Sequence, residues 1–215
     1  MPSTPVDWSS IATPKVQWPQ TSEDEVPEPY LETGIEGVTL TPHRSDNADI
    51  RTMIIMSNTP SLARWSFRRM YPYEKTDALV WLLHQIPPAV RATTQLQAGL
   101  PLSPKHCPFN VMRKDGQFIG DCDLFHAEGE WRLGYTVHPD YHNKGICTAA
   151  VKQLIAWGRD NIGFKQLTAH AEEANGPSQA VLKKLGFRKE DVESQEWPEY
   201  HGGGHRDVGI WRLDL

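Results

Sequence analysis

The residues with the clearest chemical pattern lie at positions 141–158, YHNKGICTAAVKQLIAWG, where small residues come directly before an amphipathic segment. Apolar residues at helical spacing after Gly145 predict a helix that begins there. The first N–H groups of a helix lack partners within it, and the helix dipole adds partial positive charge at that end. The stretch therefore predicts a site for a phosphate, or better a diphosphate, on the N–H groups from about Asn143 to Cys147, with the Thr148 hydroxyl beside them.

A lone glycine also has a simpler interpretation. Gly145 could merely let a surface loop turn, with Lys144 exposed to solvent, and this glycine taken alone favours that interpretation. The order of motifs along the chain changes the balance. The turn follows LGYTVHPDY at 133–141, and EEANGPSQAVLKKLGFRKE at 172–190 comes after one predicted helix and one predicted strand.

This succession resembles the GNAT acetyltransferase superfamily, and in detail the branch that includes the ribosomal-protein alanine N-acetyltransferases. The positions that carry the likeness are Gly134, Tyr135, Pro139, Tyr141, Lys144, Gly145 and Ile146, then Asn175, Ser178, Val181, Leu182, Lys184, Leu185, Gly186 and Phe187. The likeness extends over about residues 37–215, because NTP at 58–60 and RRMYPYEKTDALVWL at 68–82 resemble the family's first helices.

The chain departs from the family pattern at two places. The phosphate loop of the superfamily reads arginine or glutamine, two residues, glycine, one residue, then glycine or alanine, whereas this chain has His142 and Cys147 at the two ends. Cysteine is small and histidine can order the loop, so coenzyme binding is still expected. Arg132 replaces the glutamate often found two residues before the GY motif, which leaves the general base open.

The resemblance implies that acetyl coenzyme A is the co-substrate and lies where two neighbouring strands splay apart. It implies that the pantetheine arm pairs along one strand, that the N–H near Val137 stabilises the oxyanion, that Asn175 contacts the pantetheine and that Ser178 protonates the departing thiolate. The coenzyme-binding residues it implies are Tyr135, Thr136, Val137, His142, Asn143, Lys144, Gly145, Ile146, Cys147, Thr148 and Asn175.

Three carboxylates are candidates to accept the proton of the attacking amine, directly or through water: Asp121, Asp123 and Glu130. Each of them could equally be a solvated strand residue. Ser178 could equally be an early-turn residue that satisfies local backbone groups, and only the family pattern places catalysis ahead. His138 follows the predicted coenzyme strand, but HPDY at 138–141 is also a plausible turn.

The sequence HGGGH at 201–205 places two imidazoles four residues apart, a spacing that binds metals on a helix. Three consecutive glycines oppose a helix, so we expect a flexible loop and no metal site. Cys147 as an acyl-carrying nucleophile is the weaker interpretation, since the family pattern places a structural residue there. The tryptophans and the aromatic residues of 68–73 line either the acceptor site or the core.

The elements that must position these groups follow from periodicity. Strands are expected near 37–41, in 109–125 and 130–137, at 164–171 and at 204–215, and helices near 46–58, from about 76 to the prolines at 87 and 88, at 148–161 and at 176–186. Residues 87–108 are expected to form a long surface connection. The sum is an α/β (α+β) fold with a GNAT-like, mixed and mostly antiparallel central sheet, helices on both faces and one strand–helix–strand crossover.

The composition limits the class of protein. The 215 residues favour one acetyltransferase domain at 35–215, after an extended arm at 1–34 that could be disordered. The formal net charge of −5 argues against nucleic acid, and neither a membrane span nor a secretion signal is evident, so a cytoplasmic protein is expected. The three cysteines lack metal or disulfide spacing.

Function and partners follow as expectations. The leading hypothesis is an N-acetyltransferase that moves an acetyl group to a primary amine, either a peptide N-terminus or a small molecule, by direct attack in a ternary complex. The alternative is a non-catalytic acyl-coenzyme A sensor or scaffold, an interpretation that Arg132 keeps open. The protein is expected to be a monomer or a homodimer, and the N-terminal arm could mediate dimerisation or partner docking.

Overall fold

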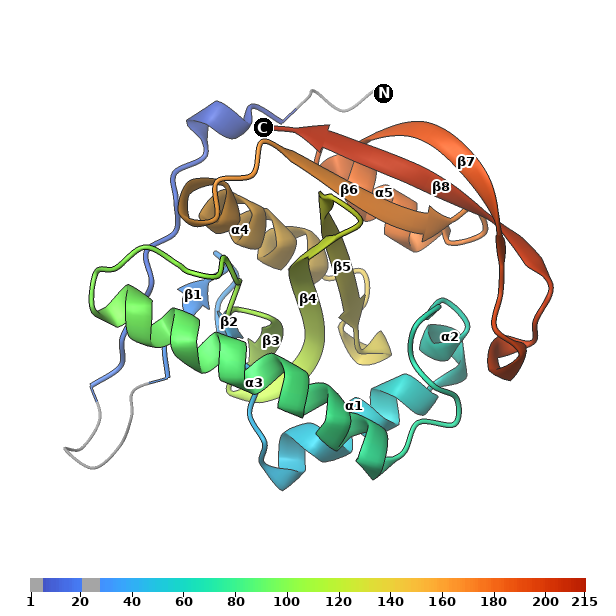
Figure 1. Cartoon of the computed structure of the whole chain (residues 1–215), viewed down its shortest axis with the longest axis horizontal. Coiled ribbons are helices and arrows are strands. Elements are labelled where there is room, and N and C mark those ends of the chain that lie inside the picture. The colour runs from blue at the N-terminus through green and yellow to red at the C-terminus, as the bar shows by residue number, and fades with distance from the viewer. Residues whose placement is uncertain (1–5, 21–27) are drawn as a thin grey trace.

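The computed structural model describes residues 6–20 and 28–215, and within this part of the chain eight strands form one sheet (Figure 1). Their spatial order is β1-β2-β3-β4-β5-β6-β8-β7. The strands are β1 (Leu31–Glu32), β2 (Val38–Thr41), β3 (Val111–Lys114), β4 (Gln117–Ala127), β5 (Glu130–Val137), β6 (Gln166–Glu172), β7 (Arg188–Glu196) and β8 (His205–Asp214). All neighbours pair antiparallel except β5 and β6, which confirms the predicted mixed sheet.

Helices cover both faces of this sheet, as predicted. On one face α1 (Asn47–Asn58) and α3 (Lys75–Gln97) pack over Val111 and Phe118, with the short α2 (Pro60–Ala63) between them in sequence. On the other face α4 (Ile146–Asn161) and α5 (Gly176–Lys184) pack over Met112, Leu124 and Leu133. Helix α4 is the crossover between the parallel strands β5 and β6, so the strand before it and the loop at its start are held by the same core.

The prediction that helix α3 ends at the two prolines was wrong. Pro87 and Pro88 lie inside the helix, which continues to Gln97 through the segment expected to be a surface connection. A proline inside a helix removes a backbone donor and crowds the preceding turn. Beyond the prolines Ala89 and Ala92 are buried, so packing of the helix onto the core offsets that cost.

Strand β7 was not predicted, although its ladder with β8 runs from Arg188 to Glu196. Its sequence RKEDVESQE lacks apolar alternation because eight of its nine residues are exposed at the edge of the sheet. Edge strands rich in charge are hard to recognise from periodicity, since neither of their faces enters the core.

The described part of the N-terminal arm lies against the domain. Trp8 is buried, and its indole Nε1 donates to the carbonyl of Leu185 at 3.2 Å. Arg159 donates to the carbonyls of Trp8 and Ile11. Part of the acidic cluster of the arm, residues 23–25, lies outside the described residues. The sheet begins before residue 35, because β1 pairs with β2.

Candidate functional site

The loop before α4 presents backbone donors to open space. Gly145 is the N-cap of α4, with φ of 74°, a left-handed conformation that glycine adopts without strain. No side chain of residues 6–20 or 28–215 caps this helix, and a Cβ built on Gly145 would meet no atom within 4 Å. The first N–H groups of α4, from Ile146 to Thr148, therefore lie at an open surface with the positive end of the helix dipole behind them.

The residues before Gly145 shape the loop. His142 donates from Nε2 to the carbonyl of Val137 at 2.7 Å, which ties the loop to the end of β5. Asn143 adopts a left-handed φ of 60°, and the ammonium of Lys144 lies 5.3 Å from the ring centre of Tyr141. A histidine thus orders this loop where the family pattern has arginine or glutamine.

Cys147 packs against the core at the start of α4. Burial, together with the nearby charge of Asp121, raises the pKa of the Cys147 thiol to about 12. The thiol is therefore protonated at neutral pH, which argues against Cys147 as a nucleophile.

Strand β5 has one paired edge and one open edge beside the loop. Its antiparallel ladder with β4 continues to Val137, whereas its parallel pairing with β6 is the single pair Arg132 and Thr168 (Figure 1). The N–H of His138 donates to Ile119 on the β4 side at 2.8 Å. Successive peptide groups in a strand point to opposite edges, so the N–H groups of Tyr135 and Val137 point toward the open edge.

A pair of hydroxyl groups lies beside this open edge. The Tyr135 hydroxyl donates to the Ser178 carbonyl at 3.0 Å and lies 3.0 Å from Ser178 Oγ. Asn175 caps α5, because its Oδ1 accepts from the N–H of Ser178 at 3.2 Å. Burial raises the pKa of Tyr135, so both hydroxyls keep their protons at neutral pH. The sequence indicated Ser178 and the backbone of Tyr135, but not this contact between their side chains.

The candidate carboxylates lie on the opposite face of the sheet, where Asp121 and Asp123 are two residues apart on β4. Asp121 forms an ion pair with Arg69. Glu130 accepts hydrogen bonds from Thr168 and Arg132, each at 2.9 Å, and despite its partial burial these bonds lower the pKa of Glu130. Both carboxylates therefore already have charged or hydrogen-bonding partners in the protein.

Asp123 has different surroundings. Among the described residues it forms no ion pair, and its register partner on β5 is Gly134. A Cβ on Gly134 would meet only the Phe125 ring, at 3.8 Å, so there is room beside Asp123. Burial, with a smaller effect from the charge of Asp121, raises the pKa of Asp123 from 3.8 to about 7. Asp123 can therefore take up and release a proton near neutral pH.

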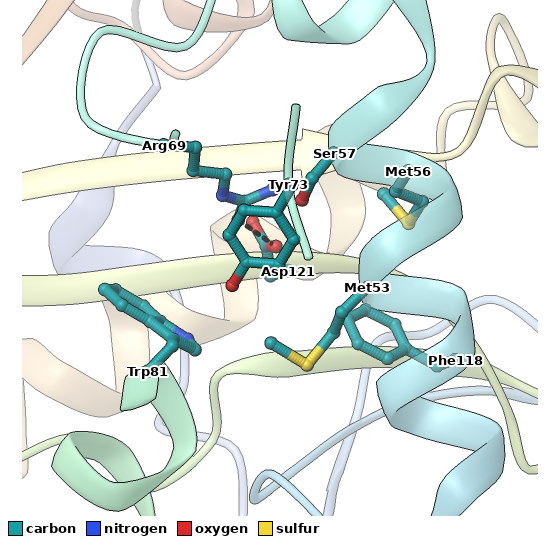
Figure 2. Close-up of a pocket in the computed structure, with 8 residues that line it drawn as sticks. All are labelled: Met53, Met56, Ser57, Arg69, Tyr73, Trp81, Phe118 and Asp121. Atoms are coloured by element: carbon teal, nitrogen blue, oxygen red, sulfur yellow. Dashed lines mark hydrogen bonds and ion pairs between the residues drawn. The ribbon is translucent and has the colours of Figure 1, made fainter. Parts of the chain in front are cut away.

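A small hollow lies next to Asp121, between α1, the start of α3 and β4 (Figure 2). Figure 2 shows Arg69 reaching toward Asp121 and the ring of Tyr73 in front of that carboxylate. The lining residues are Met53, Met56, Ser57, Arg69, Tyr73, Trp81, Phe118 and Asp121. The sequence left the aromatic residues of 68–73 open between the acceptor site and the core, and it gave no sign of Arg69, because nothing local pairs this residue with a strand residue 52 positions away.

The glycine loop at 201–205 packs on the same region. His201 donates from Nε2 to the carbonyl of Arg69 at 2.7 Å, so this nitrogen serves a protein partner. In the stretches 6–20 and 28–215, no three histidine, cysteine or acidic side chains are grouped to hold a metal ion. No helix in these stretches is long and apolar enough to cross a membrane.

Comparisons with known proteins relate this chain to one family. Residues 38–188 match the acetyltransferase (GNAT) domain family. The uncharacterized N-acetyltransferase YnaD of Bacillus subtilis is 26% identical over 100 residues, which are 42% of this chain and 59% of YnaD. The matches to curated relatives span 47–60% of the length of those relatives.

Two solved structures show the same fold. The ribosomal-protein-S5-alanine acetyltransferase of Vibrio fischeri superposes with a TM-score of 0.63 at 19% identity, over 86% of this chain and 96% of that chain. The spermidine N-acetyltransferase of Vibrio cholerae, in complex with CoA and spermine, superposes with a TM-score of 0.58 at 15% identity, over 84% and 96% of the two chains.

Proposed function

The chain belongs to the GNAT acetyltransferase family, and we propose that it transfers the acetyl group of acetyl coenzyme A to a primary amine, either a peptide N-terminus or a small-molecule amine. The single observation that carries the proposal is the open N-terminus of α4, placed by Gly145 directly beside the unpaired edge of β5. One solved neighbour holds CoA and spermine, and another is named for a ribosomal protein, which supports an amine acceptor of either kind.

In this proposal the coenzyme is held by the backbone. The N–H groups from about Asn143 to Thr148 would bind its diphosphate, because they are unpaired donors at the positive end of a helix. The edge of β5 at Tyr135 and Val137 would pair with the pantetheine arm, which resembles a strand in its amide spacing. Acetyl coenzyme A supplies the acetyl group as an activated thioester.

The chemical roles follow from protonation states. Asp123 takes the proton from the ammonium of the acceptor, because its raised pKa matches a base that works near neutral pH. The N–H of Val137, which faces the open edge, donates to the carbonyl oxygen as negative charge develops on it. Ser178 gives a proton to the departing sulfur and takes up the second proton that the attacking nitrogen loses as the amide forms, and the Tyr135 hydroxyl, 3.0 Å from Ser178 Oγ, orients it.

Calorimetric titration tests coenzyme binding. Acetyl coenzyme A and desulfo-coenzyme A are titrated into the wild type, Gly145→Asp and the matched control Gly163→Asp. Gly163 follows the other end of α4 and has a similar left-handed φ of 83°, so the control carries similar backbone strain without a carboxylate at the proposed diphosphate site. We expect submillimolar binding to the wild type and the control, and at least tenfold weaker binding to Gly145→Asp. Equal binding to all three proteins would contradict the proposal.

Turnover is tested by release of free thiol with a panel of peptide and small amines. We expect Asp123→Asn to lower kcat about 100-fold and Ser178→Ala about 10–100-fold, with the Kd for coenzyme within threefold of wild type. The control is Asp115→Asn, which changes an exposed carboxylate in the turn between β3 and β4 and should retain full activity.

Coenzyme binding without turnover on any amine favours the alternative of an acyl-coenzyme A sensor, for which Arg132 in place of the family's glutamate is the supporting observation.

A further inference from the structure

The segment 64–73, which joins α2 to α3, is held at several points by residues far away in sequence. Tyr73 exchanges two backbone hydrogen bonds with the Asn58 side chain, at 2.7 and 2.8 Å. Arg206 donates to the carbonyl of Arg64 at 2.8 Å, and His201 donates to the carbonyl of Arg69 at 2.7 Å. The backbone of the segment is thus fixed by α1, by the loop between β7 and β8 and by the start of β8.

Aromatic contacts join the same two loops. Phe67 meets Trp197 edge to face, with ring centres 5.2 Å apart, and Tyr71 lies 5.8 Å from the His201 ring. The guanidinium of Arg206 lies 4.4 Å from the ring centre of Trp197. These contacts fix the loop that carries His201, whose ring is hydrogen bonded to the carbonyl of Arg69, while the side chain of Arg69 extends toward Asp121 of β4 (Figure 2).

The side chain of Arg69 ends at Asp121. The two side chains are 29% and 20% exposed, so their ion pair is shielded from water and its charges act strongly on neighbours. Asp121 and Asp123 lie on the same face of β4, opposite Thr136 and Gly134 of β5. An unpaired Asp121 would therefore place a second negative charge beside the carboxylate that has to accept a proton.

We propose that Arg69 is a positioning residue for acetyl transfer: its guanidinium neutralises Asp121, which leaves Asp123 as the one free carboxylate on this face of β4, and His201 holds Arg69 in place through its backbone. The inference rests on the proposed function, because it assigns Asp123 the role of base. It adds two residues that lie far from β4 in the sequence: Arg69 of the segment 64–73 and His201 of the loop between β7 and β8.

Other ionisable groups near the two carboxylates come from every packed element. Asp121 is in contact with Arg69, and its charge also acts on Tyr73 from the segment before α3, on His43 just after β2 and, across the sheet, on Cys147 of α4. Asp123 is within reach of the Cys107 thiol, which burial keeps protonated. Arg132 of β5 is already paired with Glu128 and Glu130. Among these groups Arg69 is the cation in direct contact with either aspartate.

The test is a double-mutant cycle in which the two charges are removed singly and together and the pH dependence of kcat/KM is measured. Arg69→Gln leaves Asp121 unpaired, so the acidic limb of kcat/KM against pH should move up by about one pH unit. Asp121→Asn leaves Arg69 as an unpaired cation, so the limb should move down by about as much. The double variant removes both charges and should return close to the wild type. Arg69→Lys keeps the charge and should restore most of the profile.

Two further variants complete the design. His201→Phe removes the donor to the Arg69 carbonyl and should shift the limb in the same direction as Arg69→Gln, by less. Arg64→Gln removes an exposed arginine of the same segment, whose side chain lies over Trp65, and should leave the limb in place. Limbs that stay fixed in both single variants, or that move in the same direction, would overturn the role of Arg69.

A second readout separates this inference from the proposed function. The carboxyl of Asp123 is titrated by 13C NMR in the coenzyme-free protein and assigned with Asp123→Asn. If the wild type turns over amines while neither readout moves, the inference fails and the function stands. If no amine is acetylated, the function fails, and opposite NMR shifts in Arg69→Gln and Asp121→Asn still establish that Arg69 controls this carboxylate.

Discussion

Asp123 combines partial burial with the lack of an ion pair in the described part of the chain, and this has a cost for stability. Because its pKa rises from 3.8 to about 7 on folding, the native state keeps a proton that the unfolded chain releases between about pH 4 and pH 7. Asp123 therefore lowers the free energy of unfolding as the pH rises through this window. Groups that are strained or poorly solvated in the native state are typical of functional sites.

Asp123→Asn should raise the free energy of unfolding at pH 8 by on the order of 4 kcal/mol, and leave it nearly unchanged at pH 4, where the wild-type side chain is already neutral in the native state. Urea unfolding at both pH values measures the difference, with Asp115→Asn as the control expected to show no pH-dependent gain. An equal effect of Asp123→Asn at both pH values would contradict the proposed titration.

The buried pair of Arg113 and Asp49 illustrates the opposite arrangement. Arg113 donates to both carboxylate oxygens of Asp49, at 2.8 and 2.6 Å, and to the Thr41 hydroxyl at 2.7 Å. Such a pair is stable because each buried charge is compensated and hydrogen bonded. It joins β3, α1 and the end of β2, so it fixes α1 on the face of the sheet that carries Asp121.

At the scale of elements, the helices present their ends to the site and their sides to the core. The N-terminus of α4 carries the Gly145 loop, and the N-terminus of α5 carries Asn175 and Ser178. Helix α3 differs, because it contributes a long side wall and contains two prolines in its middle. Its continuation depends on the burial of Ala89 and Ala92 beyond the prolines.

A substitution in α3 tests whether the prolines destabilise the helix and packing offsets their cost. Pro87→Ala should restore a backbone hydrogen bond and relieve crowding against the preceding turn, which raises the free energy of unfolding by about 1–2 kcal/mol. The measurement is chemical denaturation with the helix signal followed by circular dichroism. Arg91→Ala, at an exposed position of the same helix, should change stability by less than about 0.5 kcal/mol. A destabilised Pro87→Ala protein would show that the proline ring itself is needed for packing.

At the scale of the whole molecule, the N-terminal arm ties together the far ends of the two site helices. Trp8 donates to Leu185, the C-cap of α5, and accepts from Arg159, in the last turn of α4. The opposite ends of these helices carry the proposed coenzyme site. The described part of the arm, through Trp8, therefore stabilises the ends of these helices that lie away from the proposed coenzyme site.

Removal of this anchor should destabilise the protein. Trp8→Ala leaves a cavity between α4 and α5, and the free energy of unfolding should fall by about 3 kcal/mol. Trp18→Ala, at a half-buried position of the same arm, should cost clearly less. Thermal and urea unfolding of the two variants provide the comparison, and equal losses would show that the arm docks as a whole and not through Trp8.

The sequence by itself determined the features that depend on neighbouring residues. These are the glycine turn into α4, the helix expected at 176–186, the strands and the longer helices from β2 to β6, and the membership in the GNAT family. Each is encoded locally, because turn chemistry, capping and hydrophobic periodicity act over a few residues. The same reasoning failed at Pro87 and at β7, where distant packing or edge pairing overrides the local pattern.

Only the tertiary structure decided which side chains share an environment. It placed Tyr135 against Ser178, Arg69 against Asp121, and His201 against the backbone of Arg69. It also distinguished three carboxylates that look alike in the sequence, since Asp121 and Glu130 have cationic partners and Asp123 does not among the described residues. Burial and ion pairing depend on segments far apart along the chain, so the charge state of each carboxylate was determined by the fold and not by its neighbours in sequence.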